Sequence, residues 1–270
     1  MPSIRYFLFV SVLSVLLVLV IGCGGSSGPA TGVGLDASGA GAAEAPPVGP
    51  ASLGTTLTGG SSYSSYYVAA GDIYWYRLLA DTSTKRWVVT LQPTVGEDSD
   101  LRIFQMTGSK GTWTELGKSL RSHSTGYSDS VRGGYNPDWV AFQAGSGRET
   151  HVAVYGVTGG ATPKHYRIEA DLVPDLVLNT PTAETYAYHY NSVWYRIHAY
   201  SGYHYTLSLA ANSGDPDMYL YKATSSGFAY KSAVTGGGTL RFTPSITADY
   251  YVRVYGYSSG RFTLRLTRAS

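Results

Sequence analysis

Paired aspartates recur at the same spacing in two distant parts of the chain. Asp98 and Asp100 introduce one apolar stretch, and Asp215 and Asp217 introduce another of the same pattern. Alternate carboxylates in a turn can supply oxygens to a calcium ion, which takes about six to eight of them, so calcium is one candidate cofactor. The alternative is that each aspartate caps its turn by accepting hydrogen bonds from backbone amides. The sequence favours the capping role because it holds no complete calcium-binding loop.

Tyrosine and arginine alternate with aliphatic residues in segments 218–221 and 251–257. Neighbouring residues of a strand point to opposite faces, so the aliphatic residues are expected to face a core and the others to face away from it. If both segments lie in one sheet, they form an exposed surface suited to a sugar ring or an extended polypeptide. The candidate binding residues are Tyr219, Tyr221, Tyr251, Arg253, Tyr255 and Tyr257. The alternative is that these side chains pair across strands or bury against another part of the chain.

Catalytic and nucleic-acid-binding patterns are missing from the sequence. No nucleophile, base and acid occur together with a local signature, so we expect no enzyme activity. His198 and His204 flank a turn and could meet in a hairpin, but a zinc site needs further ligands that the sequence does not indicate. A net charge of +2 without a cluster of basic residues argues against nucleic acid as a partner.

The single cysteine, Cys23, follows a charged N-terminus and an apolar run from Tyr6 to Ile21. This is the pattern of a secretory signal peptide, and its last residues before Cys23 resemble a bacterial lipobox. The resemblance implies that Cys23 becomes the lipidated first residue of the mature chain. The alternative is an ordinary signal peptide with an incidental cysteine. Gly24 in place of aspartate favours the outer membrane or the cell surface, by analogy with Gram-negative sorting signals. We therefore expect a protein of the cell envelope that is attached to the membrane through this N-terminal lipid anchor.

The composition predicts an all-β protein. The chain has 24 tyrosines and 33 glycines, and residues that favour strands outnumber the best helix formers. Alternating segments bounded by turn residues predict strands throughout the second half and most of the first. The predicted strand regions are 73–78, 86–91, 98–104, 139–142, 151–155, 165–170, 193–197, 205–209, 215–221, 239–242, 251–255 and 261–266.

These strands fall into two copies of one unit, most clearly at segments 149–157 and 249–257. We predict a signal peptide at 1–22, a flexible Gly/Ala/Ser/Pro linker at 23–51, a first β-sandwich at 52–172 and a second at 173–270. The junction between the sandwiches is short, so we expect them to lie close together. The first copy also has a longer polar stretch at 108–137, with Trp113, His123, Tyr127 and Tyr135. Such an insertion is either a functional loop or a mobile surface loop without a function of its own.

The second copy resembles the bacterial pre-peptidase C-terminal (PPC) domain, and the first resembles it more loosely. The similarity lies in segments 194–196, 215–221, 249–257 and 261–266, and in segments 98–104 and 151–156 of the first copy. It implies a jelly-roll-like β-sandwich that usually accompanies a secreted protease, with some relatives binding collagen, polysaccharide or calcium. The two predicted sandwiches cover nearly all of residues 52–270, so we expect no peptidase domain among them. We therefore predict a non-catalytic lipoprotein with tandem PPC-like domains that binds a polysaccharide, a cell-wall glycan or an extracellular protein. The alternative is a structural envelope protein that positions or stabilises a partner.

Overall fold

The computed structural model describes residues 55–58, 61–69, 71–78, 85–93, 99–107, 112–119, 138–156, 164–224 and 227–269. Residues 34–270 belong to one compact unit, which contains all the described residues. The predicted signal peptide, Cys23, the predicted linker and Asp98 lie outside the described residues. So do His123, Tyr127 and Tyr135.

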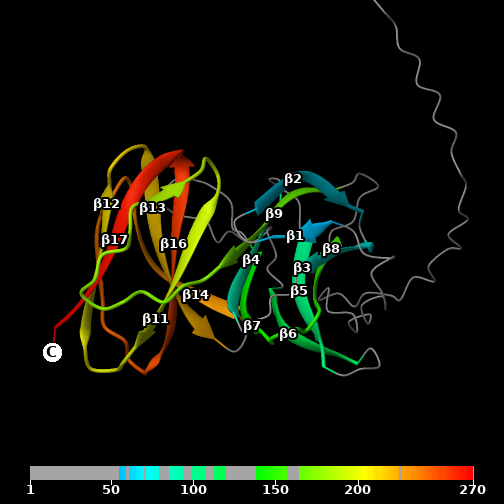
Figure 1. Ribbon diagram of the computed structural model, residues 1–270, viewed down its shortest axis with the longest axis horizontal. Coiled ribbons are helices and arrows are strands. Elements are labelled where there is room, and N and C mark those ends of the chain that lie inside the picture. Colours follow the sequence, from blue (N-terminus) through cyan, green and yellow to red (C-terminus); the bar gives the residue numbers. More distant parts are fainter. Residues whose placement is uncertain are drawn as a thin grey trace, which may run out of the picture. The chain divides into compact units, whose positions relative to one another are not determined.

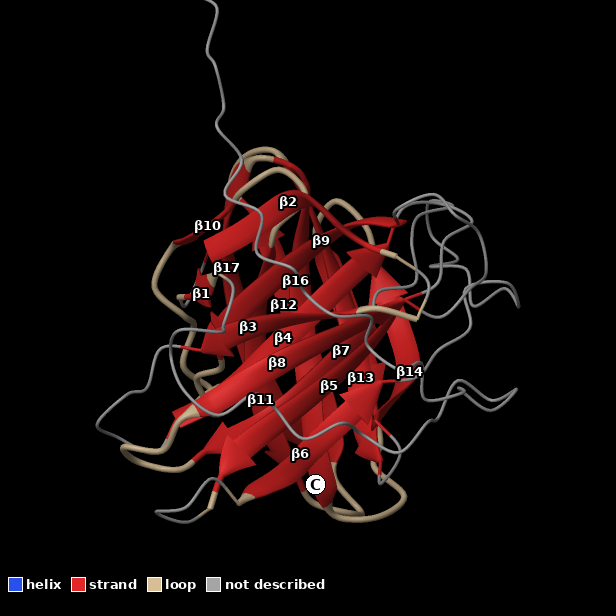
Figure 2. Cartoon of the chain, turned by 90° about the vertical axis from the view of Figure 1, so that its right-hand side faces the viewer, coloured by secondary structure: helices blue, strands red, loops and turns tan. Residues whose placement is uncertain are grey.

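The described residues contain strands and no helix, which confirms the all-β prediction. Figure 2 accordingly shows only strands and loops in the described part. The first-half strands are β1 (Thr56–Leu57), β2 (Ser61–Val68), β3 (Ile73–Leu78), β4 (Lys85–Pro93), β5 (Ser99–Met106), β6 (Trp113–Ser119), β7 (Asp138–Ala144), β8 (Thr150–Gly156) and β9 (Lys164–Leu172). The second-half strands are β10 (Thr185–Ala187), β11 (Ser192–Ala199), β12 (His204–Ala211), β13 (Asp215–Thr224), β14 (Gly227–Val234), β15 (Gly238–Phe242), β16 (Ala248–Ser258) and β17 (Gly260–Ala269). This part of the chain has no helix long and apolar enough to span a membrane.

Four sheets organise these strands, two from each copy of the repeat. Sheet 1 has the order β1-β3-β8-β5-β6 and sheet 2 the order β2-β9-β4-β7. Sheet 3 has the order β11-β16-β13-β14 and sheet 4 the order β10-β17-β12-β15. In Figure 1, β1 to β9 (blue to green) lie on the right and β11 to β17 (yellow to red) on the left.

Three apolar layers separate the four sheets. The first lies between sheets 1 and 2 and includes Ile103 and Val89. Another lies between sheets 3 and 4 and includes Val252 and Leu207. The remaining layer joins the two sandwiches, because it contains side chains of sheets 2 and 3. Sheets 2 and 3 are therefore interior layers, covered on both faces where these clusters pack.

The period-2 pattern explains which residues enter which layer. In β13 and β16, the alternate residues Met218, Leu220, Val252 and Val254 are fully buried in the layer shared with sheet 4. The residues between them point to the opposite face, as a pleated strand requires. The two strands pair directly, with Tyr219 opposite Arg253. The aliphatic residues face a core, as expected, and the condition that both segments lie in one sheet is met.

Every predicted strand region contains a strand of the structure, but several strands were not predicted. The polar stretch 108–137 contains β6, which pairs with β5, and β14 pairs with β13 in the corresponding position of the second copy. The hairpin that could have brought His198 and His204 together does not form, and both histidines are exposed. Strands β11 and β12 belong to different sheets, so the turn between them crosses from one layer of the sandwich to the other.

Candidate functional site

The tyrosine face predicted as a binding surface is buried between the two sandwiches. Tyr219, Tyr221, Tyr251 and Arg253 are 2%, 6%, 7% and 2% exposed. Tyr255 is half-buried. The expectation of an open face is therefore wrong for these residues, and the alternative of burial against the other repeat holds. Only Tyr257, which is 42% exposed, remains on the surface.

Trp139 of β7 covers this face from the first sandwich. Its ring lies 4.5 Å from the ring of Trp194 and 4.5 Å from that of Tyr221, the latter edge-on. Val88 and Val173 complete the contact from the first copy and from the junction. Aromatic pairs at such separations add to the free energy gained by burying their area. The face is thus an internal contact that no ligand reaches in this arrangement.

A buried polar network accompanies the aromatic contact. Arg253 Nε donates a hydrogen bond of 2.8 Å to Ser192 Oγ. The backbone amide of Ser192 donates to both carboxylate oxygens of Glu169 on β9, at 2.9 and 3.1 Å. The guanidinium carbon of Arg253 also lies 4.5 Å from the centre of the Tyr255 ring. Arg253 therefore has a role in joining the repeats.

Burial governs the protonation of the two acids in this network. It raises the pKa of Glu169 to about 7, against the opposing effects of the Ser192 amide, Arg253 and Arg167. Burial also raises the pKa of Asp171, and the nearby charge of Glu169 raises it further. The two carboxyls lie close together in this buried region, so retention of a proton avoids the repulsion between two buried negative charges.

The candidate calcium ligands have local partners instead. Asp217 is 1% exposed, and its Oδ1 accepts a hydrogen bond of 3.1 Å from the backbone amide of Gly236. The hydroxyl of Tyr219 donates to Asp217 Oδ2 at 3.3 Å. Asp100 is buried, and Asp215 is partly exposed. Among the described residues, no three metal-ligating side chains gather into a group. The contacts of Asp217 are those of the capping alternative.

A second aromatic surface, missed by the sequence analysis, lies at the edge of the second sandwich. Tyr186, Tyr188 and Tyr190 are 43%, 62% and 47% exposed, whereas Ala187 between them is fully buried. Strand β10 pairs with β17 and places Tyr186 directly opposite Arg261. The chain then crosses toward sheet 3, where the amide of Tyr190 donates to the carbonyl of Gly256 at 2.7 Å.

Gly256 allows this crossing because the backbone of Tyr188 passes directly over it. A Cβ atom at position 256 would overlap the carbonyl oxygen of Tyr188. Close approach of two backbones is one of the situations that require glycine. The segment that carries the exposed tyrosines is therefore packed against β16.

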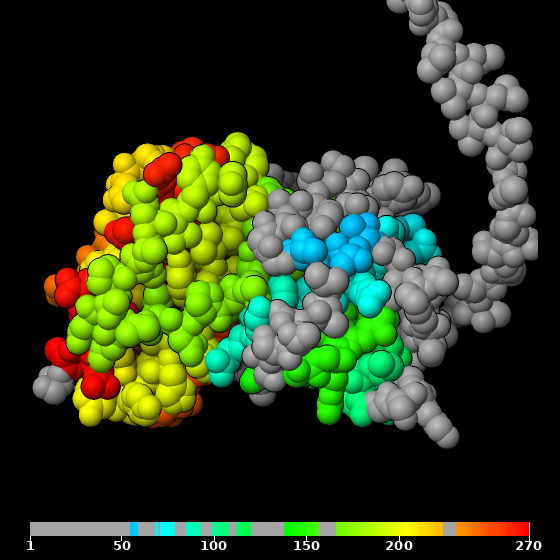
Figure 3. Space-filling model, viewed as in Figure 1, coloured from blue at the N-terminus to red at the C-terminus, as the bar shows by residue number. Residues whose placement is uncertain are grey.

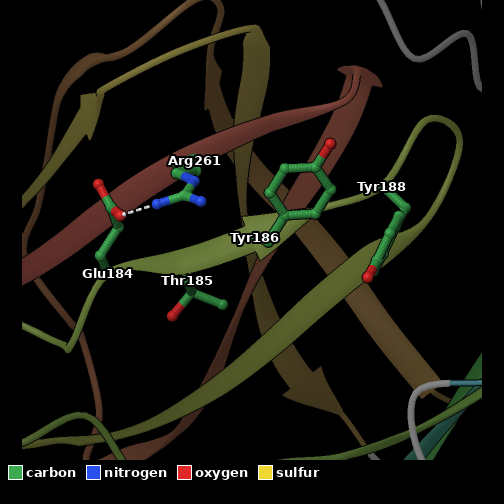
Figure 4. A pocket seen from close by; sticks show the side chains of 5 residues that line it. All are labelled: Glu184, Thr185, Tyr186, Tyr188 and Arg261. Atoms are coloured by element: carbon green, nitrogen blue, oxygen red, sulfur yellow. Dashed lines mark hydrogen bonds and ion pairs between the residues drawn. The ribbon is translucent and has the colours of Figure 1, made fainter.

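A pocket of about 440 Å³ opens beside these tyrosines. It is lined by Glu184, Thr185, Tyr186, Tyr188 and Arg261. Figure 4 shows Tyr186 between the Glu184–Arg261 pair and Tyr188. The rings of Tyr186 and Tyr188 lie 4.7 Å apart at an angle of 70°, so they present surfaces in different directions.

The charged groups of the pocket hold one another in place. Arg261 Nη1 donates to Glu184 Oε2 at 2.9 Å, and Asn212 Nδ2 donates to Glu184 Oε1 at 2.8 Å. The hydrogen bond from Asn212, followed by that from Arg261, lowers the pKa of Glu184. Glu184 therefore stays ionised near neutral pH and is not suited to donate a proton. Thr185 Oγ1 already donates to the carbonyl of Ala183, at 3.1 Å.

This arrangement suits binding rather than bond cleavage. Exposed tyrosine rings offer flat apolar area with a hydroxyl at the edge, and the carboxylate and guanidinium offer fixed hydrogen-bonding groups. A sugar ring presents the matching combination of apolar face and hydroxyl rim. A sequence signal for this site exists in the alternation of Tyr186, Tyr188 and Tyr190. It is short and lacks the aliphatic alternation that identified the other strands.

No protein-family model and no curated protein sequence matches the chain. Several solved structures are similar at low identity. One is the pre-peptidase C-terminal domain of a collagenase from Bacillus anthracis, at 11% identity and a TM-score of 0.30, covering 44% of this chain and 96% of that one. Another comprises the CUB1-EGF-CUB2 domains of rat MASP-1, at 10% identity and a TM-score of 0.26, covering 78% of this chain and all of that one. A third is PNGase F, a glycosylasparaginase from Flavobacterium meningosepticum, at 10% identity and a TM-score of 0.28, covering 78% and 99%. At these scores the similarities support no inference about activity or ligand.

Proposed function

We propose that this protein is a non-catalytic binding protein that holds a polysaccharide through the pocket at Tyr186 and Tyr188. The proposal keeps the hypothesis, drawn from the sequence, that the protein binds a polymer, but it assigns the binding site to different residues. The predicted face at Tyr219 and Tyr251 is replaced by an exposed surface on the second sandwich. A lipid anchor at Cys23 and a location at the outer membrane or cell surface remain part of this proposal.

The observation that carries the proposal is the pocket itself. Two tyrosine rings, 43% and 62% exposed, line the pocket beside an ionised Glu184–Arg261 pair. Isolated exposed apolar residues are ordinary on protein surfaces, but tyrosines gathered around fixed polar groups are typical of ligand sites. The stiff aromatic rings also lose little conformational entropy when a ligand binds.

The structural alternative is favoured by a different observation, the buried contact between sheets 2 and 3. A chain whose two repeats share an apolar layer could act as a rigid spacer that positions a partner protein. Such a spacer would not need the Tyr186–Tyr188 pocket. A variant without the pocket therefore distinguishes the two functions, because it would lose polysaccharide binding but would still act as a spacer.

The test is a glycan array with purified full-length protein in detergent, followed by titration of the polysaccharides retained. Tyr188→Ala is expected to weaken binding about tenfold or more, because truncating a central aromatic contact typically costs over about 1 kcal/mol. Tyr200→Ala is the matched control. Tyr200 is 49% exposed and lies beyond the opposite end of β11 from the pocket. Equal binding by wild type and Tyr188→Ala, or no retained glycan, would refute the proposal.

A further inference from the structure

The outer face of sheet 4 adjoins the pocket and is rich in hydroxyl groups and arginine. Alternate residues of β12, β15 and β17 point away from the core, and two rows across the sheet combine the two kinds of side chain. Thr206 lies opposite both Arg241 and Thr267. Ser208 lies opposite both Thr239 and Arg265. The red atoms of β17 reach the surface on the left of Figure 3.

The charged side chains on the strands of this face are basic. The strands β10, β12, β15 and β17 contain no aspartate and no glutamate. Their outward arginines are Arg241, Arg261 and Arg265, all of them exposed. Arg261 is paired with Glu184, but neither Arg241 nor Arg265 forms an ion pair with a described residue. An unneutralised basic face attracts an acidic partner.

The face is continuous with the pocket through Arg261. Tyr186 and Arg261 are opposite each other in the β10–β17 ladder, so their side chains lie on the same side of sheet 4. Arg265 is four residues further along the same strand, about 13 Å at the usual rise of a strand. Arg241 is two strands away, about 10 Å across the sheet. A chain that places one ring at Tyr186 can therefore extend over Arg265.

We propose that the polymer held by this protein is an acidic polysaccharide whose anionic groups pair with Arg265 and Arg241. The inference rests on the proposed function and names the class of ligand. Guanidinium groups pair with carboxylate and sulfate through two parallel hydrogen bonds, whereas the threonine and serine hydroxyls can bond to sugar hydroxyls. The tyrosine pocket supplies the contact to a sugar ring.

The spacing of the arginines favours a polysaccharide over other polyanions. Duplex DNA carries a charge about every 1.7 Å of its axis and is bound by clustered basic residues. An anionic membrane surface is bound by clusters of about four to eight lysines and arginines. Three arginines separated by 10 Å or so, with hydroxyl side chains between them, match neither pattern. They match a polymer whose charges are spaced by whole sugar residues.

The test compares polymers that differ only in charge. Full-length protein in detergent is titrated with polygalacturonate and its methyl ester, and with dextran sulfate and dextran. We expect at least one acidic polymer to bind about tenfold more tightly than its neutral counterpart. Arg265→Gln is expected to remove most of this preference and to weaken its dependence on salt. Lys231→Gln, which removes an exposed cation on β14, is the control and should bind like wild type.

Three results would overturn the inference. The first is equal binding of the acidic and neutral polymers, or an acidic preference that Arg265→Gln leaves unchanged. If Tyr188→Ala still weakens the binding of these polymers in that case, the proposed function stands and only the class of ligand is wrong. The second is no binding of either acidic polymer. The third is binding of phosphatidylglycerol vesicles or duplex DNA as tight as that of the polysaccharide and equally reduced by Arg265→Gln.

Discussion

Replacing Glu169 by glutamine should change how the stability of the protein depends on pH. Glu169 lies in the contact between the repeats, and its carboxylate oxygens accept hydrogen bonds from the backbone amide of Ser192. Burial raises the pKa of Glu169 to about 7. In the unfolded chain the carboxyl titrates near its ordinary value of 4.5. Between these two values the folded protein holds a proton that the unfolded chain has lost. The free energy of unfolding therefore falls as the pH rises through this interval.

The size of the effect follows from the interval between the two pKa values. At about 1.4 kcal/mol per pH unit, the interval from 4.5 to about 7 corresponds to a loss of about 3 kcal/mol. The stability contribution is fully present below pH 4.5 and is lost above pH 7. Glutamine keeps the shape of the side chain and does not titrate. From pH 5 to pH 8, the free energy of unfolding of Glu169→Gln should therefore fall by about 2–3 kcal/mol less than that of wild type. Asp171, whose pKa is also raised, keeps a dependence of the same sign in both proteins.

Urea denaturation of the full-length protein at pH 5 and pH 8 measures this difference. Tryptophan fluorescence is a suitable signal because Trp139 and Trp194 lie in the same contact. Glu184→Gln is the control, because the pKa of Glu184 is lowered and its contribution to stability is already present above the ordinary value of 4.5. The free energy of unfolding of Glu184→Gln should therefore change between pH 5 and pH 8 as that of wild type does. If wild type and Glu169→Gln show the same change in unfolding free energy from pH 5 to pH 8, Glu169 does not titrate as its burial requires.

Two further predictions concern the contact between the repeats and the paired aspartates. Trp194→Ala should lower the free energy of unfolding by about 3–5 kcal/mol, because Trp194 is fully buried against Trp139. A loss below about 1 kcal/mol in urea titrations would show that the repeats do not depend on this contact. Adding calcium or a chelator should leave the thermal midpoint unchanged, because Asp217 is already bonded to Gly236 and Tyr219. A calcium-dependent rise in the midpoint would instead show that the aspartates bind the ion.

The strand pattern was predictable because it depends on local alternation. Segment 251–255 alternates valine with tyrosine and arginine, and a pleated strand must then place the valines together on one face. The same reasoning located the strands of both repeats and assigned the faces of β13 and β16 correctly. It failed for β6 and β14, whose sequences contain glycine and lack a regular alternation of aliphatic and polar residues. These strands pair with β5 and β13.

The exposure of the tyrosines was not predictable, because it depends on contacts between residues far apart in the chain. Tyr219 and Tyr186 both alternate with inward-facing residues, and a tyrosine ring is compatible with either a core or a surface. Tyr219 lies on an interior sheet and is covered by the layer that contains Trp139, whereas Tyr186 lies on the outer sheet of the second sandwich. The sequence by itself determined most of the strands, the faces of β13 and β16 and the correspondence between the two halves of the chain. The tertiary structure decided which faces dock, because docking depends on how two whole surfaces fit together and not on the pattern of either one.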